Sequence, residues 1–335
     1  MLARRVLLRL LQAVPTLAGV AVLVFVLVRV VPGDPVAMMI PPGASAEDVV
    51  RLHALYGLDK PILDQFAIWA GQAVRGDFGL SITSRQGVAG LILSRLPATL
   101  ELVLLAAAIA IALGVTLAVI GTRFAGGGGE AAVDAASGFA LAVPDFVWGL
   151  GFILLFGVVW PVLPISGRAD PTQALGLASN FTLIESLLRL RFALAGEVLA
   201  HMLMPAVALA LPLAAMIARV LKSSLAEQMA QDYVLLARVK GFTRLRVIVA
   251  EALRNAALPT VSLTGVQVTF LVGGTVLIER IFSYPGIGNL AIDAVINRDL
   301  PLIQGLILTF AALFILINLA LDLSYALLDP RLRHG

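Results

Sequence analysis

Five stretches of this sequence are mostly apolar, contain no charged side chain and are close to the length of a membrane-crossing helix. They are residues 10–28, 102–122, 202–218, 255–278 and 300–321, with 19, 21, 17, 24 and 22 residues. A helix needs about 20 consecutive apolar residues to cross a bilayer, and one charge at the centre costs about 2.5–3.5 kcal/mol on insertion scales. The pattern therefore predicts five membrane-crossing helices.

A sixth stretch, 135–160, is long enough to cross but contains Asp145 directly after Pro144. Proline disfavours helical backbone at the residue before it. We therefore expect this span in two packed pieces, with Asp145 near its middle or at one end. Acids inside a membrane can relay protons, but for Asp322, near the end of the last span, hydrogen bonds to a neighbouring helix are the better interpretation.

The composition is that of an all-α membrane protein. Hydrophobic residues make up 60% of the 335 residues and charged ones 13%, with a mean hydropathy of +0.98, whereas soluble domains are about 45–50% apolar and about 25% charged. Long apolar runs exclude a β-barrel, whose strands alternate apolar and polar side chains. The absence of cysteine excludes disulfides, thiolate metal sites and a catalytic thiol. A net charge of +3 gives no reason to expect nucleic acid as a partner.

The distribution of basic residues predicts the orientation. With a cytoplasmic N-terminus, six spans place 13 of the 24 lysines and arginines on the cytoplasmic side. The others are spread over longer outer segments, many beside acids, as the positive-inside rule describes. The first apolar run is too long for a signal-peptide core and lacks a clear cleavage site, so we expect a retained helix. Both termini are then cytoplasmic.

The segment 30–95 is too polar to cross the membrane and is expected to fold on its outer side. Ser45 and Asp48 have the spacing of a capping box, and Gly57 is suited to end the helix that follows. Pro61 then begins a second amphipathic stretch. The pattern predicts two short helices.

The cytoplasmic segment 219–254 has helix-forming residues, then Gly241, then a basic stretch that returns to helix. Such a segment can anchor on anionic lipid or dock on a soluble partner. Composition alone favours the anchor. We expect removal of the charges of Arg244 and Arg246 to have a milder effect than a bulky residue at Gly241, because these two side chains would touch only lipid headgroups.

No catalytic or nucleotide-binding motif stands out in the sequence. It contains no G-x-x-x-x-G-K-[ST], and the glycine run 126–129 is followed by Glu130, with no phosphate-binding lysine. The three histidines lie far apart without H-E-x-x-H, and no Ser/His/Asp constellation can be assembled. We expect a chain that is not an enzyme and holds no cofactor or metal, with the glycine run as a turn between the second and third helices.

A series of short motifs runs along residues 32–333. They are P-G-D-P at 32–35, G-L-D-K-P at 57–61, G-D-F-G at 76–79, R-L-P-A-T-L-E-L at 95–102, L-P-I-S-G at 163–167, D-Y-V at 232–234, A-L-R-N-A at 252–256, Y-P-G at 284–286, R-D-L-P at 298–301 and D-P-R at 329–331. Each is weak alone. In this order and spacing they resemble the permease subunits of dipeptide/oligopeptide-type ABC importers.

The resemblance implies a type I ABC importer permease of about six transmembrane helices in the bacterial cytoplasmic (inner) membrane, with a folded periplasmic insertion after the first helix. The implied segments are 1–29 (cytoplasmic end and first helix), 30–96 (periplasmic insertion), 97–329 (transmembrane core, with a coupling loop at 222–256) and 330–335 (cytoplasmic C-terminus).

The cytoplasmic loop resembles the EAA loop of this family, whose short coupling helix fits a groove on the ATPase subunit. The matching positions are Asp232, Tyr233, Ala237, Arg238, Lys240 and Gly241. Leu235, Leu236 and Glu251 depart from the motif, which has Glu, Ala and often His there. A glycine permits a sharp turn or a close approach of backbones. The resemblance therefore favours docking over lipid anchoring.

The resemblance also implies partners: a second homologous permease subunit, two cytoplasmic ATPase subunits that bind ATP and Mg²⁺, a periplasmic or lipid-anchored substrate-binding protein, and membrane lipid. Candidates for facing the binding protein are Asp34, Asp77, Arg298 and Asp299. Short peptides are the first expected substrate, while nickel, glutathione, opines and sugars stay open. An ion-gradient-driven secondary transporter is less favoured, because no inverted repeat is found.

Overall fold

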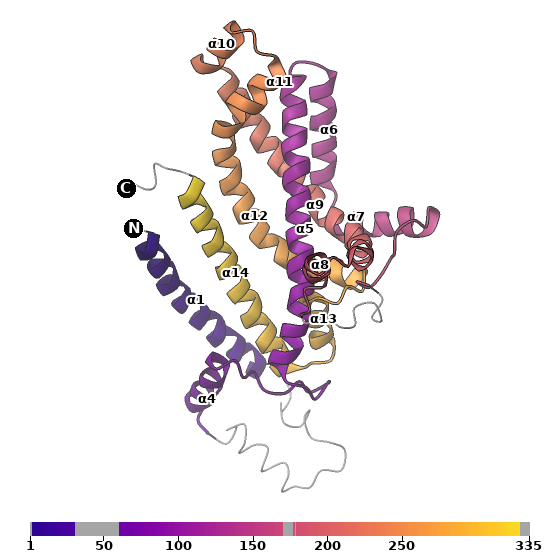
Figure 1. The fold of residues 1–335 in the computed structure, drawn as a ribbon. Helices are drawn as coiled ribbons and strands as arrows, with labels where there is room; N and C mark the ends of the chain where they lie inside the picture. The colour runs from indigo at the N-terminus through magenta and orange to yellow at the C-terminus, as the bar shows by residue number, and fades with distance from the viewer. Residues whose placement is uncertain (1, 31–59, 170–176, 178, 329–335) are drawn as a thin grey trace. The chain divides into compact units, whose positions relative to one another are not determined.

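The computed structural model describes residues 2–30, 60–169, 177 and 179–328, which are mainly helical (Figure 1). Among these residues the only extended pairing is an isolated bridge between Leu80 and Gly87, so the all-α prediction is confirmed. The elements are α1 (Leu2–Val30), α4 (Ile62–Val74), α5 (Val88–Arg123), α6 (Gly128–Ala142), α7 (Asp145–Phe152), η1 (Ile153–Val159), α8 (Thr182–Leu188), α9 (Phe192–Met229), α10 (Asp232–Val239), α11 (Arg244–Arg246), η2 (Val247–Ala252), α12 (Leu253–Ile281), α13 (Ile287–Ile296) and α14 (Leu300–Leu328), where η marks π-helix.

Four stretches of the described chain are long and apolar enough to cross a membrane: α5, α9, the segment Arg244–Ile281, and Leu300–Leu321 of α14. α6 and the α7–η1 segment pass the same test together and make a fifth if they form one span. Within α1, the segment Leu11–Leu27 is an apolar helix that is shorter than these four. The chain is a multi-pass membrane protein, and its helices occur where the uncharged stretches predict them.

The predicted break in the third span is confirmed. α6 ends at Ala142, α7 begins at Asp145, and the two parts are bent by 99°. Val143 and Pro144 between them have extended ψ angles of 121° and 148°, in line with the restriction that proline places on the preceding residue. Asp145 therefore lies at the bend.

The outer segment is described from residue 60 onward. The predicted second helix is confirmed as α4, with Pro61 as its N-cap. The predicted first helix, with Ser45 and Gly57, lies outside the described residues, as does Asp34. The segment limits expected from the sequence stay predictions.

Contacts divide the chain into two units, residues 1–96 with 290–319 and residues 97–289 with 320–335. In the first unit, Phe25 of α1 packs on two aromatic side chains of α4. Its ring centroid lies 5.2 Å from that of Phe66 and 5.6 Å from that of Trp69. These aromatic contacts attach α4 to α1.

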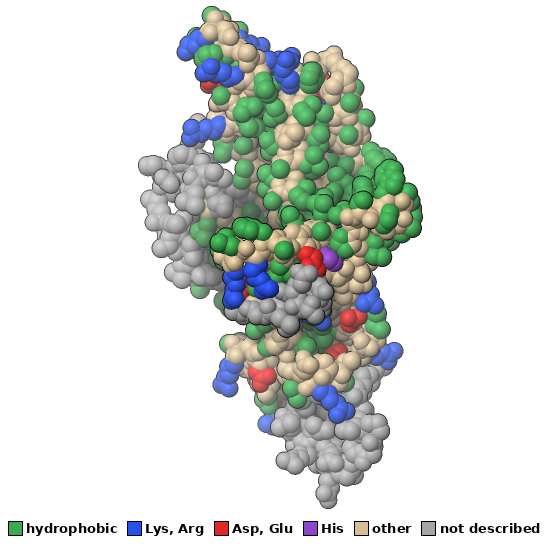
Figure 2. Space-filling model, turned by 45° about the vertical axis from the view of Figure 1, so that its right-hand side comes forward, with side chains coloured by type: hydrophobic (Ala, Val, Ile, Leu, Met, Phe, Trp, Pro, Cys, Tyr) green, Lys and Arg blue, Asp and Glu red, His purple; other side chains and the backbone are tan. Residues whose placement is uncertain are grey.

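In the second unit, α9 packs against α6, α7, α8 and α12. α5 crosses α9 at Gly114, where a Cβ atom would lie 2.7 Å from Ile217 and 2.8 Å from the carbonyl oxygen of Ala214. A small residue permits this close approach of two helices. α10 and α11 lie together at one end of the unit, and Figure 2 shows Lys and Arg side chains gathered there, beyond the apolar surface of the long helices.

Candidate functional site

The loop between α9 and α12 forms a helix, a sharp turn and a second helix, as predicted. Lys240 is the C-cap of α10, and Gly241 follows at φ +80°. The N–H of Gly241 donates to the carbonyl of Arg238 at 2.9 Å. The N–H of Phe242 donates to the carbonyl of Ala237 at 3.3 Å. The two bonds make a Schellman motif, which places its glycine in the left-handed region.

The second helix of the loop begins at a capping residue. The hydroxyl of Thr243 accepts a hydrogen bond of 3.4 Å from the N–H of Arg246. The guanidinium of Arg246 in turn lies 3.9 Å from the ring centroid of Phe242, a cation–π contact. These contacts are local to the turn.

One side of α10 is buried, with Val234 at 0% and Ala237 at 5% exposure. Both belong to an apolar cluster, here called the α10 seat, which joins α10 to α5, α9, η2 and α12. The buried members of the α10 seat are Ala118, Leu221, Leu225, Val234, Ala237, Val247, Ile248, Ala252 and Ala256. Close-packed interiors have low compressibility, and the seat packs α10 against residues of these four elements.

The opposite side of α10 is apolar and exposed. Leu235, Leu236 and Val239, here called the exposed α10 face, have exposures of 60%, 55% and 78%. Leu235 and Leu236 are two of the positions that depart from the EAA motif. An exposed apolar patch with polar residues around it is typical of an interaction surface.

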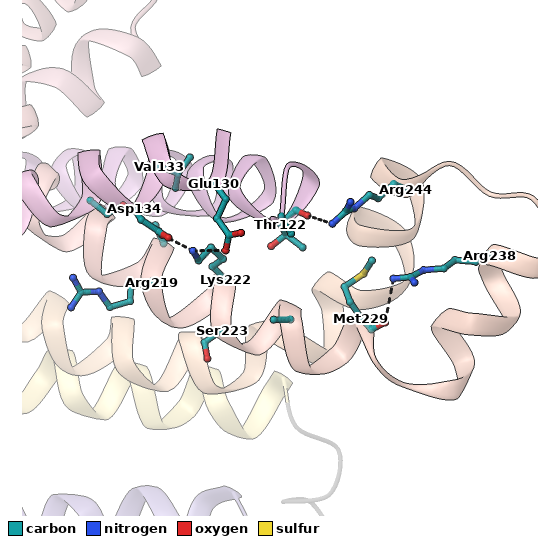
Figure 3. A pocket seen from close by; sticks show the side chains of 14 residues that line it. Thr122, Glu130, Val133, Asp134, Arg219, Lys222, Ser223, Met229, Arg238 and Arg244 are labelled. Atoms are coloured by element: carbon teal, nitrogen blue, oxygen red, sulfur yellow. Dashed lines mark hydrogen bonds and ion pairs between the residues drawn. The ribbon is translucent and has the colours of Figure 1, made fainter. Parts of the chain in front are cut away.

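Two arginines attach the loop to the ends of long helices (Figure 3). Arg238 donates to the carbonyl of Met229, the last residue of α9, at 3.3 Å. Arg244 donates to the carbonyl of Thr122, in the last turn of α5, at 2.9 Å. Cations at helix C-termini satisfy carbonyls that have no helical partner and interact favourably with the helix dipole. The prediction that Arg244 touches only lipid headgroups is therefore wrong.

Tyr233 makes a third attachment. Its hydroxyl donates to Oε1 of Gln228 at 2.8 Å and accepts from Nδ2 of Asn255 at 3.3 Å. Gln228 belongs to the last turn of α9 and Asn255 to the first turn of α12. The side chain thus connects α10 to the two helices on either side of the loop.

Behind the loop lies a cavity of ≈ 630 Å³ between α5, α6 and α9. Inside it, Nζ of Lys222 lies 3.0 Å from Oε1 of Glu130 and 2.5 Å from Oδ1 of Asp134, as Figure 3 shows. The other carboxylate oxygen of Glu130 accepts the N–H of Gly126 at 2.7 Å, and Gly126 has φ +80°. Gly126 and Gly127 thus lie in the predicted turn between helices, whereas Gly128 and Gly129 already belong to α6. Glu130, which follows the glycine run, connects α6 to Lys222 of α9.

The structure brings all six predicted coupling residues together on α10 and its turn. Ala237 faces the seat, Arg238 and Tyr233 make attachments, and Gly241 forms the turn. Asp232 and Lys240 are exposed at the two ends of α10, where their charges complement the helix dipole. Their coupling role stays a prediction.

The described outer candidates differ in exposure. Asp77 is exposed and accepts the N–H of Gly79 at 2.9 Å, and Arg298 is exposed at φ 52°. Asp299 is 0% exposed. Its carboxylate accepts from the Ser81 hydroxyl at 2.5 Å and caps the N-terminus of α14. The Asp299 side chain is therefore not on a surface that a binding protein would contact.

The sequence predicts no structural role for two buried acids, Glu101, which lies in the motif at 95–102, and Glu279. Glu101 pairs with Arg168 at 2.5 Å and accepts two N–H groups at the start of α8, at 3.2 and 3.0 Å. Glu279 accepts the hydroxyl of Thr99 at 2.6 Å and the N–H groups of Gly288 and Asn289 at 2.8 and 3.0 Å. Glu101 directly precedes the uncharged stretch 102–122, and Glu279 directly follows the stretch 255–278. An acid at the border of an uncharged stretch is the sequence feature by which both could be found.

Among the described residues, no group of three or more His, Asp or Glu is placed to hold a metal ion. Near Glu279, burial raises the pKa of the Tyr284 hydroxyl. At α10 the described residues form an exposed apolar face, a close-packed seat and hydrogen bonds from arginines to the ends of α9 and α5.

Comparison with known proteins shows the family to which this chain belongs. Residues 110–334 match the family described as "Binding-protein-dependent transport system inner membrane component", and residues 1–103 match the family of its N-terminal region. The protein is thus a transport permease of the inner membrane. The chain belongs to the family of inner-membrane components of binding-protein-dependent transport systems, and the resemblance to dipeptide-type ABC importer permeases is confirmed.

Several relatives cover nearly the whole chain. The di/tripeptide transport system permease protein DppB of Pseudomonas aeruginosa is 40% identical over 326 residues, 96% of each chain. The dipeptide transport system permease protein DppB of Escherichia coli (strain K12) is 39% identical over 328 residues, again 96% of each. The glutathione transport system permease protein GsiC of the same strain is 34% identical over 326 residues, 97% of each.

Proposed function

We propose that this chain is a permease subunit of an ATP-driven importer of short peptides. It forms the translocation pathway with a second homologous permease subunit, and it works with two cytoplasmic ATPase subunits and a periplasmic or lipid-anchored substrate-binding protein. Relatives named as dipeptide and di/tripeptide permeases support the substrate class. Glutathione is the second candidate, because a glutathione permease is 34% identical.

The observation that carries the coupling role is the two-sided character of α10. Its exposed face is apolar, while its other side is seated on residues of α5, α9, η2 and α12. A surface helix that only rested on anionic lipid would not need a buried seat against four other elements. A helix that receives a displacement from a partner needs both surfaces.

The proposed mechanism follows from these contacts. The ATPase subunits bind ATP and Mg²⁺ and hydrolyse the nucleotide, since this sequence has no G-x-x-x-x-G-K-[ST]. Their closure displaces α10 through the exposed α10 face. The seat and the bonds of Arg238 and Arg244 carry the displacement into α9 and α5, and the pathway changes between outward and inward access. α10 and both termini lie on the cytoplasmic side.

The docking role of α10 is tested by substituting two aliphatic residues that are equally exposed. Val239 on the exposed α10 face and Leu188 on α8 are both 78% exposed. We expect Val239→Asp to abolish co-purification of the ATPase subunits and ATP-dependent uptake, because a carboxylate would be buried at an apolar interface. Leu188→Asp, at the other end of α9, should retain both. Equal co-purification of the two variants would contradict docking through α10.

The substrate class is tested in vesicles that contain the reconstituted complex. Uptake of a labelled dipeptide, a longer peptide, glutathione and nickel is measured with the cognate binding protein present. We expect saturable, ATP-dependent uptake of the dipeptide. Saturable uptake of nickel alone would contradict the peptide assignment. Undiminished dipeptide uptake without the binding protein would contradict its role in selection.

A further inference from the structure

The bend between α6 and α7 opens into a second cavity, separate from the coupling site. This cavity, of ≈ 260 Å³, lies between the bend, α9 and α12. The residues that line it are Leu141, Val143, Pro144, Asp145, Leu209, Pro212, Leu213, Met216, Gln267, Phe270, Leu271 and Gly274. Of these, only Asp145 is ionisable and only Gln267 has an amide side chain. The rest of the lining is apolar or proline.

The cavity lies at the depth of the membrane. Its α9 residues fall within the uncharged stretch 202–218, and its α12 residues fall within the uncharged stretch 255–278. Gln267 is near the middle of the latter. Asp145 therefore lies among residues that face the hydrocarbon layer or the interior of the bundle. An ionisable residue at such a depth is expensive to insert and typically marks a pathway for a polar substrate or ion.

The Asp145 carboxylate has room and lacks a countercharge. Its Oδ1 accepts the N–H of Phe146 at 2.7 Å. Its Oδ2 lies over Gly274, where a Cβ atom would be only 3.2 Å away. None of the described residues forms an ion pair with Asp145. On the facing helix, the amide of Gln267 contacts Sδ of Met216 and provides donor and acceptor groups to the same cavity.

The residues and the volume of this cavity fit one kind of ligand better than a proton relay or a divalent cation. A proton relay needs a second titratable group within reach, and no other lining residue titrates. A divalent cation such as Ca²⁺ needs about six to eight oxygen ligands, which one carboxylate and one amide do not supply. The volume is below the range of about 300–1,000 Å³ for pockets that enclose a whole small ligand. One end of a larger molecule with a single positive charge fits all three observations.

We propose that Asp145 binds the protonated amino terminus of a peptide as it passes through the pathway, with Gln267 hydrogen-bonded to the adjacent peptide group. This inference rests on the proposed peptide substrate. The ammonium supplies the countercharge that Asp145 lacks, and Gly274 leaves space for the contact. One carboxylate holds the terminus without enclosing the rest of the molecule, so the peptide can leave again.

The experiment uses the complete complex in vesicles, with binding protein and ATP. The variants are Asp145→Asn, which removes the charge, Asp145→Glu, which retains it, and Asp64→Asn on the exposed surface of α4 as a control. We expect Asp145→Asn to lower dipeptide uptake per ATP hydrolysed by about tenfold or more, as the loss of a charged hydrogen bond predicts. Asp145→Glu should recover part of the rate, and Asp64→Asn should equal the unmodified complex.

A second measurement is independent of folding of the variants. A carbodiimide joins a carboxylate to a primary amine, and we expect it to attach a labelled dipeptide to Asp145 of the unmodified complex, as located by mass spectrometry. An N-acetylated dipeptide, which has no free amino terminus, should not be attached at Asp145. If the unmodified complex imports dipeptide but Asp145→Asn imports it equally well and no attachment occurs, this inference is wrong. If the unmodified complex imports no peptide, the proposed function itself is wrong.

Discussion

The guanidinium of Arg244 donates a hydrogen bond of 2.9 Å to the carbonyl oxygen of Thr122, 122 residues earlier in the chain. The bond joins the short helix after Gly241 to the last turn of α5. An arginine at this place stabilises carbonyls that have no helical partner. The loop between α9 and α12 is therefore bonded directly to α5 as well as to its neighbours in sequence.

We predict that Arg244→Gln uncouples transport, whereas Arg246→Gln has a small effect. Arg244 connects two elements, and hydrogen bonds from charged groups contribute about 1.5–3 kcal/mol at best, less where water has access. The guanidinium of Arg246 lies over the ring of Phe242, within the same turn. The measurement is dipeptide uptake per ATP hydrolysed in reconstituted vesicles, where Arg244→Gln should fall several-fold. Equal ratios for the two variants would show that the link to α5 is not used.

We predict that glycine is needed at position 241 because of its backbone conformation, and not because a side chain there would collide with other residues of this chain. A Cβ atom there would meet nothing within 4 Å, but φ is +80°. L-residues in the left-handed region cost about 1–2 kcal/mol, and asparagine tolerates it better than β-branched residues. Gly241→Asn should therefore retain most uptake, and Gly241→Val should lose most of it.

This pair of variants also separates two explanations for the glycine. If Gly241→Asn fails as completely as Gly241→Val, while both complexes still assemble, close approach of the ATPase to Gly241 is the stronger requirement. Retention of ATPase binding is measured by co-purification. Gly273→Ala on α12, where a Cβ atom also meets nothing within 4 Å, is the control for an unstrained glycine.

The sequence predicts the local features of this protein well. The uncharged stretches indicate the long helices, the dipeptide Val143–Pro144 indicates the broken span, and Gly241 indicates the turn between two helices. Each of these depends on residues that are neighbours along the chain. Steric restriction at proline and the left-handed preference of glycine act within one or two residues.

The long-range contacts could not be predicted in the same way. Thr99 and Glu279 bond to each other across 180 residues, and Arg244 reaches Thr122 across 122 residues. Such pairs form only when the helices pack against one another, and local patterns along the chain do not show which distant residues will meet. The charge of Arg244 predicts a lipid contact, whereas its partner in the structure is a backbone carbonyl, which has no sequence signature.

We predict the orientation of the membrane helices from the same charge pattern, and the absence of cysteine makes it directly testable. Single cysteines replace Gln72 on α4 and Ala226 on α9, both on exposed positions. An impermeant thiol reagent added to intact cells should label the cysteine at 72 and not the cysteine at 226. Inverted vesicles should give the opposite result. Labelling of both positions from outside would contradict the orientation.

The buried Glu279 is predicted to be a major determinant of stability in the second unit. Its carboxylate accepts three hydrogen bonds from buried or partly buried donors: the hydroxyl of Thr99 and the N–H groups of Gly288 and Asn289. Each buried donor left without a partner costs about 1–3 kcal/mol. Glu279→Leu should therefore destabilise the protein by several kcal/mol and lower the melting temperature of the purified complex.

Two further variants test whether the hydrogen bonds of Glu279 or its negative charge stabilises the protein. Glu279→Gln keeps an oxygen that can accept both N–H groups, so we expect a clearly smaller loss than for Glu279→Leu. Gly286→Ala should be as harmful as Glu279→Leu, because its Cβ atom would overlap the Glu279 carboxylate, whereas Gly273→Ala on the same unit meets no atom within 4 Å. If Glu279→Leu, Glu279→Gln and Gly286→Ala all had the melting temperature of the unmodified complex, the network around Glu279 would contribute nothing to stability, and the end of α12 would be held by its apolar contacts alone.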